Sequence, residues 1–206
     1  LGLAGQFARW RRGNTDVYDE IAGGSGFGMH PHQNMEIVSI PLAGALRHED
    51  DMGHAAIIRE GDVQVMSAGT GVLHSEYNAN ETEAGKFLQI WILSREQGVA
   101  PRYDQATVGW RDKKNIFQKI VGPEQEGGLW IHQDAWVLIG AFESPEVITY
   151  QVKRQGNGVY AFVIAGSAEI AGEAFGSRDG IGIWDTDTVD IKPAPGSEIL
   201  LFDVPR

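Results

Sequence analysis

The sequence predicts an all-β protein made of two barrel-like or sandwich-like halves. Three observations support this: short apolar runs rich in β-branched and aromatic residues, glycines that separate these runs, and no long helical periodicity. The chain has 206 residues with 27 glycines, and 42% of its residues are hydrophobic. That is enough apolar material for two small β domains, each with its own core.

Eight runs have the composition of strands, namely 36–42, 62–66, 87–93, 136–142, 147–152, 159–165, 188–192 and 198–204. Residues 95–114 contain Gly98, Pro101 and many polar residues, without a clear strand. We therefore expect an N-terminal domain over 1–94, a linker over 95–114 and a C-terminal domain over 115–206.

Composition excludes several classes of protein. The chain has no cysteine, so disulfides and thiolate metal sites are excluded, and a cytoplasmic location is expected. The net charge of −11 disfavours direct nucleic-acid binding. Arg9, Arg11 and Arg12 are interpreted as a solvated N-terminal turn. No apolar run approaches the ~20 residues that span a bilayer, so no membrane partner is expected.

Two histidine-containing pairs in the first half predict a metal site. In a strand, residues i and i+2 face the same side, about 6.6 Å apart. His30 and His32 have this spacing, and so do His74 and Glu76. Two such strands side by side would supply three nitrogens and one oxygen, which suits one divalent first-row transition metal.

Other histidines have less specific surroundings. His48 and His54 lie near three acidic residues, and this segment is interpreted as a solvated loop rather than a second site. His132 is the one histidine after residue 114 and is interpreted as structural.

The two halves also resemble a repeat when Gly44 is aligned with Gly166. At this offset Val152 and Arg154 take the places of the two paired histidines. The second half is therefore expected to keep the barrel and to bind no metal. Its expected value is stability, because it would cover sheet edges of the first half.

The sequence resembles the pirin family of the cupin superfamily. Gly24, His30-Pro31-His32 and Glu36 look like the first cupin motif, and Gly61-Asp62, His74 and Asn78 look like the second. Pirin-like strings extend from Ser25 to about Leu93 and include 46–53 and Leu88-Gln89-Ile90-Trp91. Residues 1–19 depart from the aromatic-rich segment that pirins carry there.

This resemblance implies a bicupin fold, with two antiparallel, jelly-roll-like β-barrel domains packed together. Many cupins use the first-motif glutamate as a ligand, which here is Glu36. Pirins use the glutamate that follows the second-motif histidine, which here is Glu76. Because the His74/Glu76 pair repeats the His30/His32 geometry, Glu76 is the preferred ligand.

The resemblance also implies a function. Related pirins are described as quercetin 2,3-dioxygenases that open a flavonol with O₂. The implied site has His30, His32, His74 and Glu76 as metal ligands, with Glu76 also catalytic. Fe(II) is the expected metal, with Ni, Cu, Mn and Zn as alternatives.

The expected partners are O₂ and a small aromatic molecule, flavonol or catechol-like, in a monomeric protein. The alternative function is non-enzymatic: a metal-binding regulator that acts through a protein partner, as animal pirins are described to do.

Overall fold

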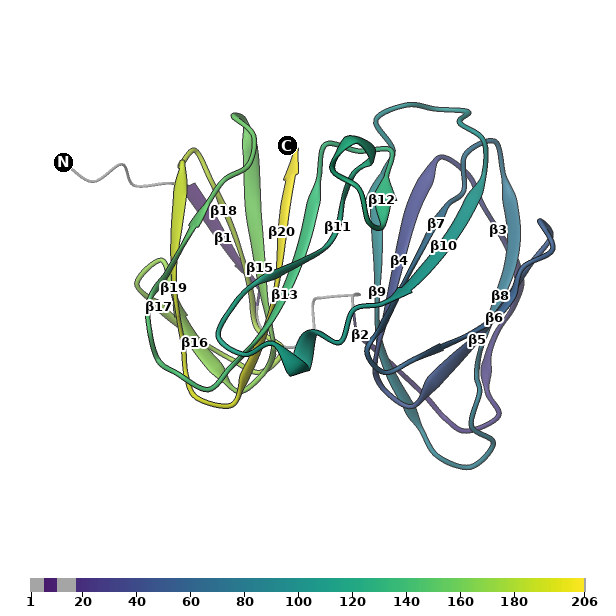
Figure 1. Ribbon diagram of the computed structural model, residues 1–206, viewed down its shortest axis with the longest axis horizontal. Helices are drawn as coiled ribbons and strands as arrows, with labels where there is room; N and C mark the ends of the chain where they lie inside the picture. Colours follow the sequence, from purple (N-terminus) through teal and green to yellow (C-terminus); the bar gives the residue numbers. More distant parts are fainter. Residues whose placement is uncertain (1–5, 11–17, 206) are drawn as a thin grey trace. The chain divides into compact units, whose positions relative to one another are not determined.

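The computed structural model describes residues 6–10 and 18–205, and for 6–10 only the backbone. The chain divides into two compact units. The N-terminal unit contains Asp16–Gly109 and Pro123–Gln133, and the C-terminal unit contains β1, Trp110–Gly122 and Asp134–Arg206. Figure 1 labels the strands of both units.

The N-terminal unit is formed by two antiparallel sheets. The first sheet has the order β10 (Arg102–Thr107), β7 (Asp62–Ser67), β4 (Met35–Ala43), β9 (Gly85–Leu93) and β2 (Tyr18–Ile21). The second has the order β3 (Gly26–His32), β8 (Val72–Asn78), β5 (Ala45–Asp50) and β6 (Ala55–Arg59).

The two sheets of this unit enclose a core to which both contribute. One cluster joins Ile21 and Phe87 of the first sheet to Leu46 and Ile58 of the second. All four are buried, and full burial of such side chains contributes about 1.5–3 kcal/mol each. Side chains that alternate inward on β5 and β8 therefore lie between the sheets.

The C-terminal unit repeats this architecture. Its larger sheet contains, in order, β1 (Gln6–Trp10), β18 (Gly180–Trp184), β15 (Asn157–Ala165), β20 (Ser197–Pro205), β13 (Trp136–Phe142) and β11 (Gln118–Pro123). Its smaller sheet has the order β14 (Ile148–Gln151), β19 (Thr188–Pro193), β16 (Ser167–Ile170) and β17 (Glu173–Gly176). The 3₁₀ turn η1 (Trp110–Asp112) also belongs to this unit, whereas the short strand β12 (Trp130–Ile131) and the 3₁₀ turn η2 (Glu124–Glu126) belong to the N-terminal unit.

The all-β prediction is confirmed, and each of the eight expected runs overlaps a strand. The sheets are open and jelly-roll-like rather than closed barrels. The sequence did not predict β10, which lies inside the segment expected to be a linker and pairs with β7 along its whole length. Its composition hid it, because Arg102–Thr107 has polar residues at four of six positions and is at most half-buried.

β1 was also not predicted. It pairs with β18, so Arg9 lies in a strand rather than in the expected N-terminal turn. Arg11 and Arg12 lie outside the described residues. Within the described residues, no helix is long and apolar enough to cross a membrane.

The internal repeat is visible in the strand order. Gly44 and Gly166 both have positive φ, 78° and 75°, and each joins a long strand to the next strand of the smaller sheet. Glycine is favoured at such positions because a Cβ would strain the left-handed backbone. The two glycines thus occupy equivalent turns, as the alignment predicted.

The predicted equivalents of the paired histidines are wrong by two residues. Two residues separate His32 from the start of β4 at Met35, whereas four separate Val152 from the start of β15 at Asn157. Counted from the paired strands, His30 corresponds to Tyr150 and His32 to Val152. The physical conclusion is unchanged, because neither residue is an imidazole.

In the same register, Val189 is the equivalent of His74 in the C-terminal unit, and Ile191 is the equivalent of Glu76. Val189 and Ile191 are buried in one apolar cluster with Tyr150, and Val152 packs against it. The Tyr150 hydroxyl donates to Asp203 at 2.9 Å. At the positions where the N-terminal unit buries His74 and Glu76, the C-terminal unit therefore buries apolar side chains.

The turn at Gly166 yields a test of this packing. A Cβ at Gly166 would lie 2.8 Å from the Ser197 Cα, whereas one at Gly172, with φ of 82°, would meet nothing within 4 Å. Gly172→Ala should lose about 1 kcal/mol from backbone strain alone. Gly166→Ala should lose about 1–3 kcal/mol more, because backbone atoms must move. Urea unfolding of both variants measures the difference, and equal losses would contradict the packing described.

Candidate metal centre

The structure brings the three predicted imidazoles together. β3 and β8 are antiparallel neighbours, and His30 is paired directly with His74. The ring centroids lie 4.4 Å apart for His30 and His74, 4.9 Å for His30 and His32, and 5.0 Å for His32 and His74. One ring nitrogen from each lies within 4.8 Å of the others. Donors about 2.1 Å from one ion lie up to about 4.2 Å apart, so small side-chain movements suffice to share it.

The electrostatics of this group favour neutral imidazoles. Burial, followed by the charges of the neighbouring histidines, lowers the pKa of His74 to about 3. Burial and then His30 also lower the pKa of His32. Neutral rings keep a nitrogen lone pair available at pH 7, which is the form that binds metals.

Unpartnered buried atoms support a bound cation here. His32 Nε2 and both ring nitrogens of His74 are buried and have no hydrogen-bond partner. Buried polar atoms in folded proteins are nearly always paired, and leaving one unpaired costs about 1–3 kcal/mol. The chemistry of three imidazole nitrogens fits a divalent first-row metal ion.

Glu76 is fully buried beside His74 but is held from the opposite sheet. Its Oε1 accepts a hydrogen bond of 3.0 Å from Ser39 Oγ on β4, and its Oε2 accepts one from Gln89 Nε2 on β9. Burial raises the pKa of Glu76, and these two hydrogen bonds oppose that shift. Its carboxylate groups with His74 and His48, rather than in one set with all three predicted imidazoles.

Glu36, the alternative ligand, lies elsewhere. β3 ends at His32 and β4 begins at Met35 in the other sheet, so the same-side argument does not extend across the break. Both Glu36 oxygens accept hydrogen bonds of 2.6 Å, one from Ser67 Oγ and one from Ser94 Oγ.

The interpretation of His48 and its neighbours as a solvated loop is wrong. His48 lies in β5 with no exposed surface, and Asp50 is also buried. His48 Nε2 donates to Asp50 Oδ2 at 3.1 Å, and the Asp50 carboxylate also accepts from the backbone amides of Met52 and His54. Strand β5 alternates buried and exposed side chains along Leu46–Asp50, and that period of two was the missed signal.

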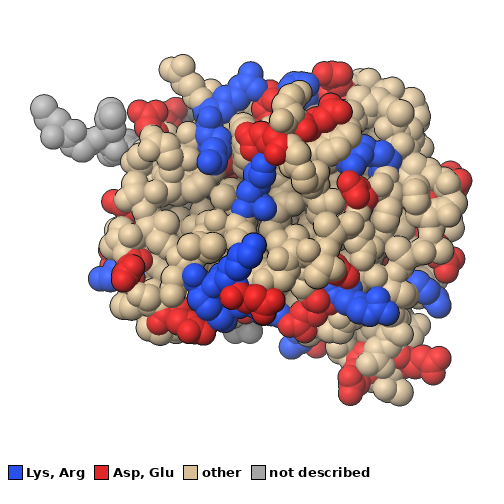
Figure 2. Space-filling view, viewed as in Figure 1, with Lys and Arg blue, Asp and Glu red and all other residues tan. Residues whose placement is uncertain are grey.

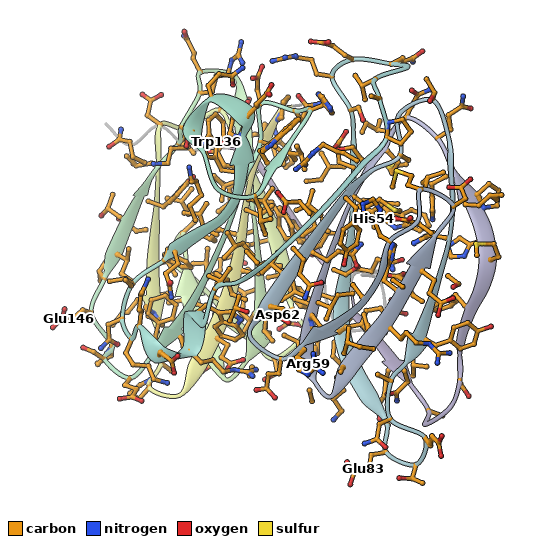
Figure 3. All side chains as sticks on the ribbon, turned by 45° about the vertical axis from the view of Figure 1, so that its right-hand side comes forward. His54, Arg59, Asp62, Glu83, Trp136 and Glu146 are labelled. Carbon is orange, nitrogen blue, oxygen red and sulfur yellow. The ribbon has the colours of Figure 1, made fainter. Side chains whose placement is uncertain are left out.

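His54 completes this buried network at its outer end. Its Nδ1 lies 2.9 Å from Asp50 Oδ2, and its side chain is 42% exposed (Figure 3). The Tyr103 ring, from β10, stacks on His48 at 4.7 Å and on His54 at 4.9 Å. Burial and nearby carboxylates, Asp50 first among them, raise the pKa of Tyr103, so its hydroxyl remains protonated.

The structure changes the account of His132. It lies in the N-terminal unit, not in the second half as expected. Its carbonyl accepts from the Arg95 amide at 2.7 Å, and its ring packs on Trp130. It belongs to neither cluster of metal-capable side chains found among the described residues.

Two open hollows adjoin the imidazoles. One, of about 510 Å³, is lined by Phe27, His30, Gln89 and Trp91 together with two glycines. Phe27 and Trp91 are exposed large apolar residues, and the Trp91 ring lies 5.2 Å from that of His32. The other hollow, of about 460 Å³, includes His32 and Leu73. Aromatic and apolar surface therefore borders the candidate centre.

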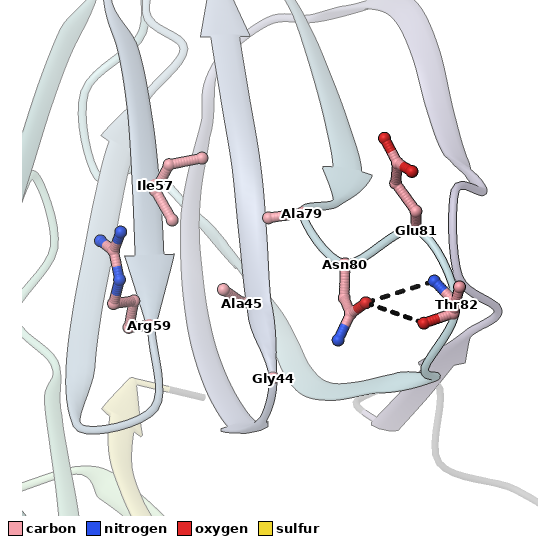
Figure 4. A pocket seen from close by; sticks show the side chains of 8 residues that line it. All are labelled: Gly44, Ala45, Ile57, Arg59, Ala79, Asn80, Glu81 and Thr82. Carbon is pink, nitrogen blue, oxygen red and sulfur yellow. Dashed lines mark hydrogen bonds between the residues drawn. The ribbon is translucent and has the colours of Figure 1, made fainter.

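A further hollow, of about 710 Å³, contains none of the predicted site residues (Figure 4). It lies between the β5–β6 region and the loop at 79–82, where Asn80 Oδ1 accepts from the Thr82 amide and hydroxyl. The face shown in Figure 2 carries interspersed acidic and basic side chains rather than a continuous basic field.

Two open, paired sheets in each unit and an inward cluster of histidines define a bicupin with a candidate metal centre. Residues 6–92 match the family model described as Pirin, and residues 120–204 match the one described as Quercetinase C-terminal cupin domain. The chain belongs to the pirin family.

Named relatives support this assignment. The chain is 38% identical over 200 residues to a protein of Escherichia coli K12 named quercetin 2,3-dioxygenase, which covers 97% of this chain and 84% of that protein. The crystal structure of YhhW from Escherichia coli has a TM-score of 0.85 and 38% identity, covering 91% of this chain and 79% of that one. The structure of the bacterial pirin YhhW in complex with nickel(II) has a TM-score of 0.84 and 37% identity, covering 91% and 80%.

Proposed function

We propose that this chain is a metal-dependent, dioxygenase-like pirin whose centre is formed by His30, His32, His74 and Glu76. The observation that carries the proposal is the convergence of three imidazoles, two of which, His32 and His74, have buried nitrogens without partners. The relative named quercetin 2,3-dioxygenase and the nickel complex of YhhW agree with it. Fe(II) and Ni(II) are the two metals we would test first, because imidazole and carboxylate ligands accept both.

The chemistry supplied by a bound divalent metal is Lewis-acid polarisation of a substrate oxygen and electron donation towards O₂. The side chains of this unit would accept the substrate proton and position the group that accepts it. Glu76, whose pKa is raised by burial, is suited to take a proton from a phenolic hydroxyl. Ser39 and Gln89 hold its two oxygens and so fix where that proton is received.

The hollow beside His30 supports a flat aromatic substrate. Trp91 and Phe27 expose ring surface there, and a planar polyphenol can stack on such rings. A flavonol fits this description and is the substrate in the name of the relative. A cytoplasmic location and a monomeric state remain predictions.

Metal content is the first test. The double variant His30→Ala/His32→Ala removes two of the three imidazoles and should abolish binding of the one transition-metal ion expected per chain. His132→Ala is the matched control and should bind as wild type, because His132 lies outside both clusters. Elemental analysis of the purified proteins gives the stoichiometry. Full occupancy in the double variant would exclude this centre.

The fourth ligand is tested by two matched substitutions. Glu76→Gln should weaken metal binding by about 10-fold or more, since a charged donor is replaced by a weaker neutral one. Glu36→Gln should have a smaller effect, because Glu36 is held by Ser67 and Ser94 in the other sheet. Competition with a chelator measures both affinities, and a reversed order would assign the role to Glu36.

Turnover separates an enzyme from a metal-binding regulator. Protein loaded with Fe(II) or Ni(II) should consume O₂ with a flavonol, and the metal-free protein should not. Oxygen uptake and loss of flavonol absorbance, measured over a panel of flavonols and catechols, test this. If metal binds with full stoichiometry but no member of the panel is consumed, the dioxygenase proposal fails and the regulatory alternative is favoured.

A further inference from the structure

We propose that His48, held by Asp50, is a positioning residue for His74. It would accept, directly or through one buried water, the hydrogen bond of the His74 ring nitrogen that does not face the metal. This inference rests on the proposed metal centre and extends it to a chain of His74, His48, Asp50 and His54.

The tautomer of His48 follows from its contact with Asp50. A neutral imidazole carries one N–H. In His48 that N–H is on Nε2, because a carboxylate oxygen lies 3.1 Å from it. Nδ1 is then a lone-pair acceptor, and it is buried without a partner.

His74 has the complementary need. If one ring nitrogen binds the metal as a lone-pair donor, the other carries the proton and needs an acceptor. Both nitrogens of His74 are buried and unpartnered, and the His48 ring centroid is 5.4 Å from that of His74. Glu76, the other acceptor in this cluster, already receives hydrogen bonds from Ser39 and Gln89 and is proposed as a ligand.

Asp50 is fixed firmly enough to orient His48. Besides His48, its carboxylate accepts hydrogen bonds from the amide of Met52 at 3.0 Å, the amide of His54 at 2.9 Å and the ring of His54. Tyr103 stacks on both imidazoles and restricts their rotation. A carboxylate that orients a histidine is the arrangement that supports metal ligands in many proteins, here with one additional imidazole between them.

The experiment measures metal affinity and the His74 proton separately. His48→Leu removes the acceptor and should weaken Ni(II) binding by about 10-fold or more, measured by chelator competition on the metal-free protein. His48→Gln keeps a polar acceptor and should recover part of the loss. His132→Gln is the matched control and should bind Ni(II) as wild type, because His132 lies outside both clusters.

Nitrogen-15 NMR of the zinc-loaded protein detects the proposed hydrogen bond between the His74 N–H and His48. We expect a slowly exchanging His74 N–H and an Nε2–H tautomer for His48. Asp50→Asn offers His48 an amide N–H in place of a carboxylate, so it should reverse the His48 tautomer and expose the His74 proton to exchange. Circular dichroism of each metal-free variant verifies that it is folded.

Two results would overturn the inference. One is Ni(II) affinity of folded His48→Leu or Asp50→Asn equal to wild type, and the other is a His74 proton unchanged in either. The double variant His30→Ala/His32→Ala, measured in parallel, tells which proposal has failed. Loss of metal there with retention in His48→Leu leaves the centre intact and excludes the positioning role, whereas retention in the double variant excludes the centre.

Discussion

The fold of the N-terminal unit depends on hydrogen-bond partners for the polar side chains that are buried between its two sheets. His48, His74 and Glu76 have no exposed surface, and burying such groups without partners destabilises a fold by about 1–3 kcal/mol each. Glu76 is satisfied from the opposite sheet by Ser39 and Gln89, so its carboxylate also ties the sheets together. The nitrogens of His74 are left unpaired, and the proposed metal ion and the proposed His48 acceptor would satisfy them.

The C-terminal unit shows the same architecture without this constraint. Where the first unit has two imidazoles on β3, the second has Tyr150 and Val152, and where the first has His74 and Glu76, the second has Val189 and Ile191. These side chains pack into an apolar core. One scaffold therefore encloses polar side chains in one unit and an apolar core in the other, because a strand register can be kept while the inward side chains change.

Much of the fold followed from local pattern. Runs of β-branched and aromatic residues predicted the long core strands, including Trp136–Phe142, and the matching turns at Gly44 and Gly166 predicted the repeat. Strands with polar sequences were missed. β10 gains its strand conformation from pairing with β7, and β5 buries a histidine and an aspartate, so composition alone suggested loops.

The sequence by itself determined that two histidine-containing pairs, His30/His32 and His74/Glu76, would each present both members to one side of a strand, since side chains alternate with a period of two. Only the tertiary structure decided what surrounds them. The pairing of β3 with β8 set the distances, and the opposite sheet supplied Ser39 and Gln89. The burial of His48 and Asp50 beside His74 also depends on tertiary contacts, because hydrogen bonds between strands distant in sequence leave no local pattern to detect.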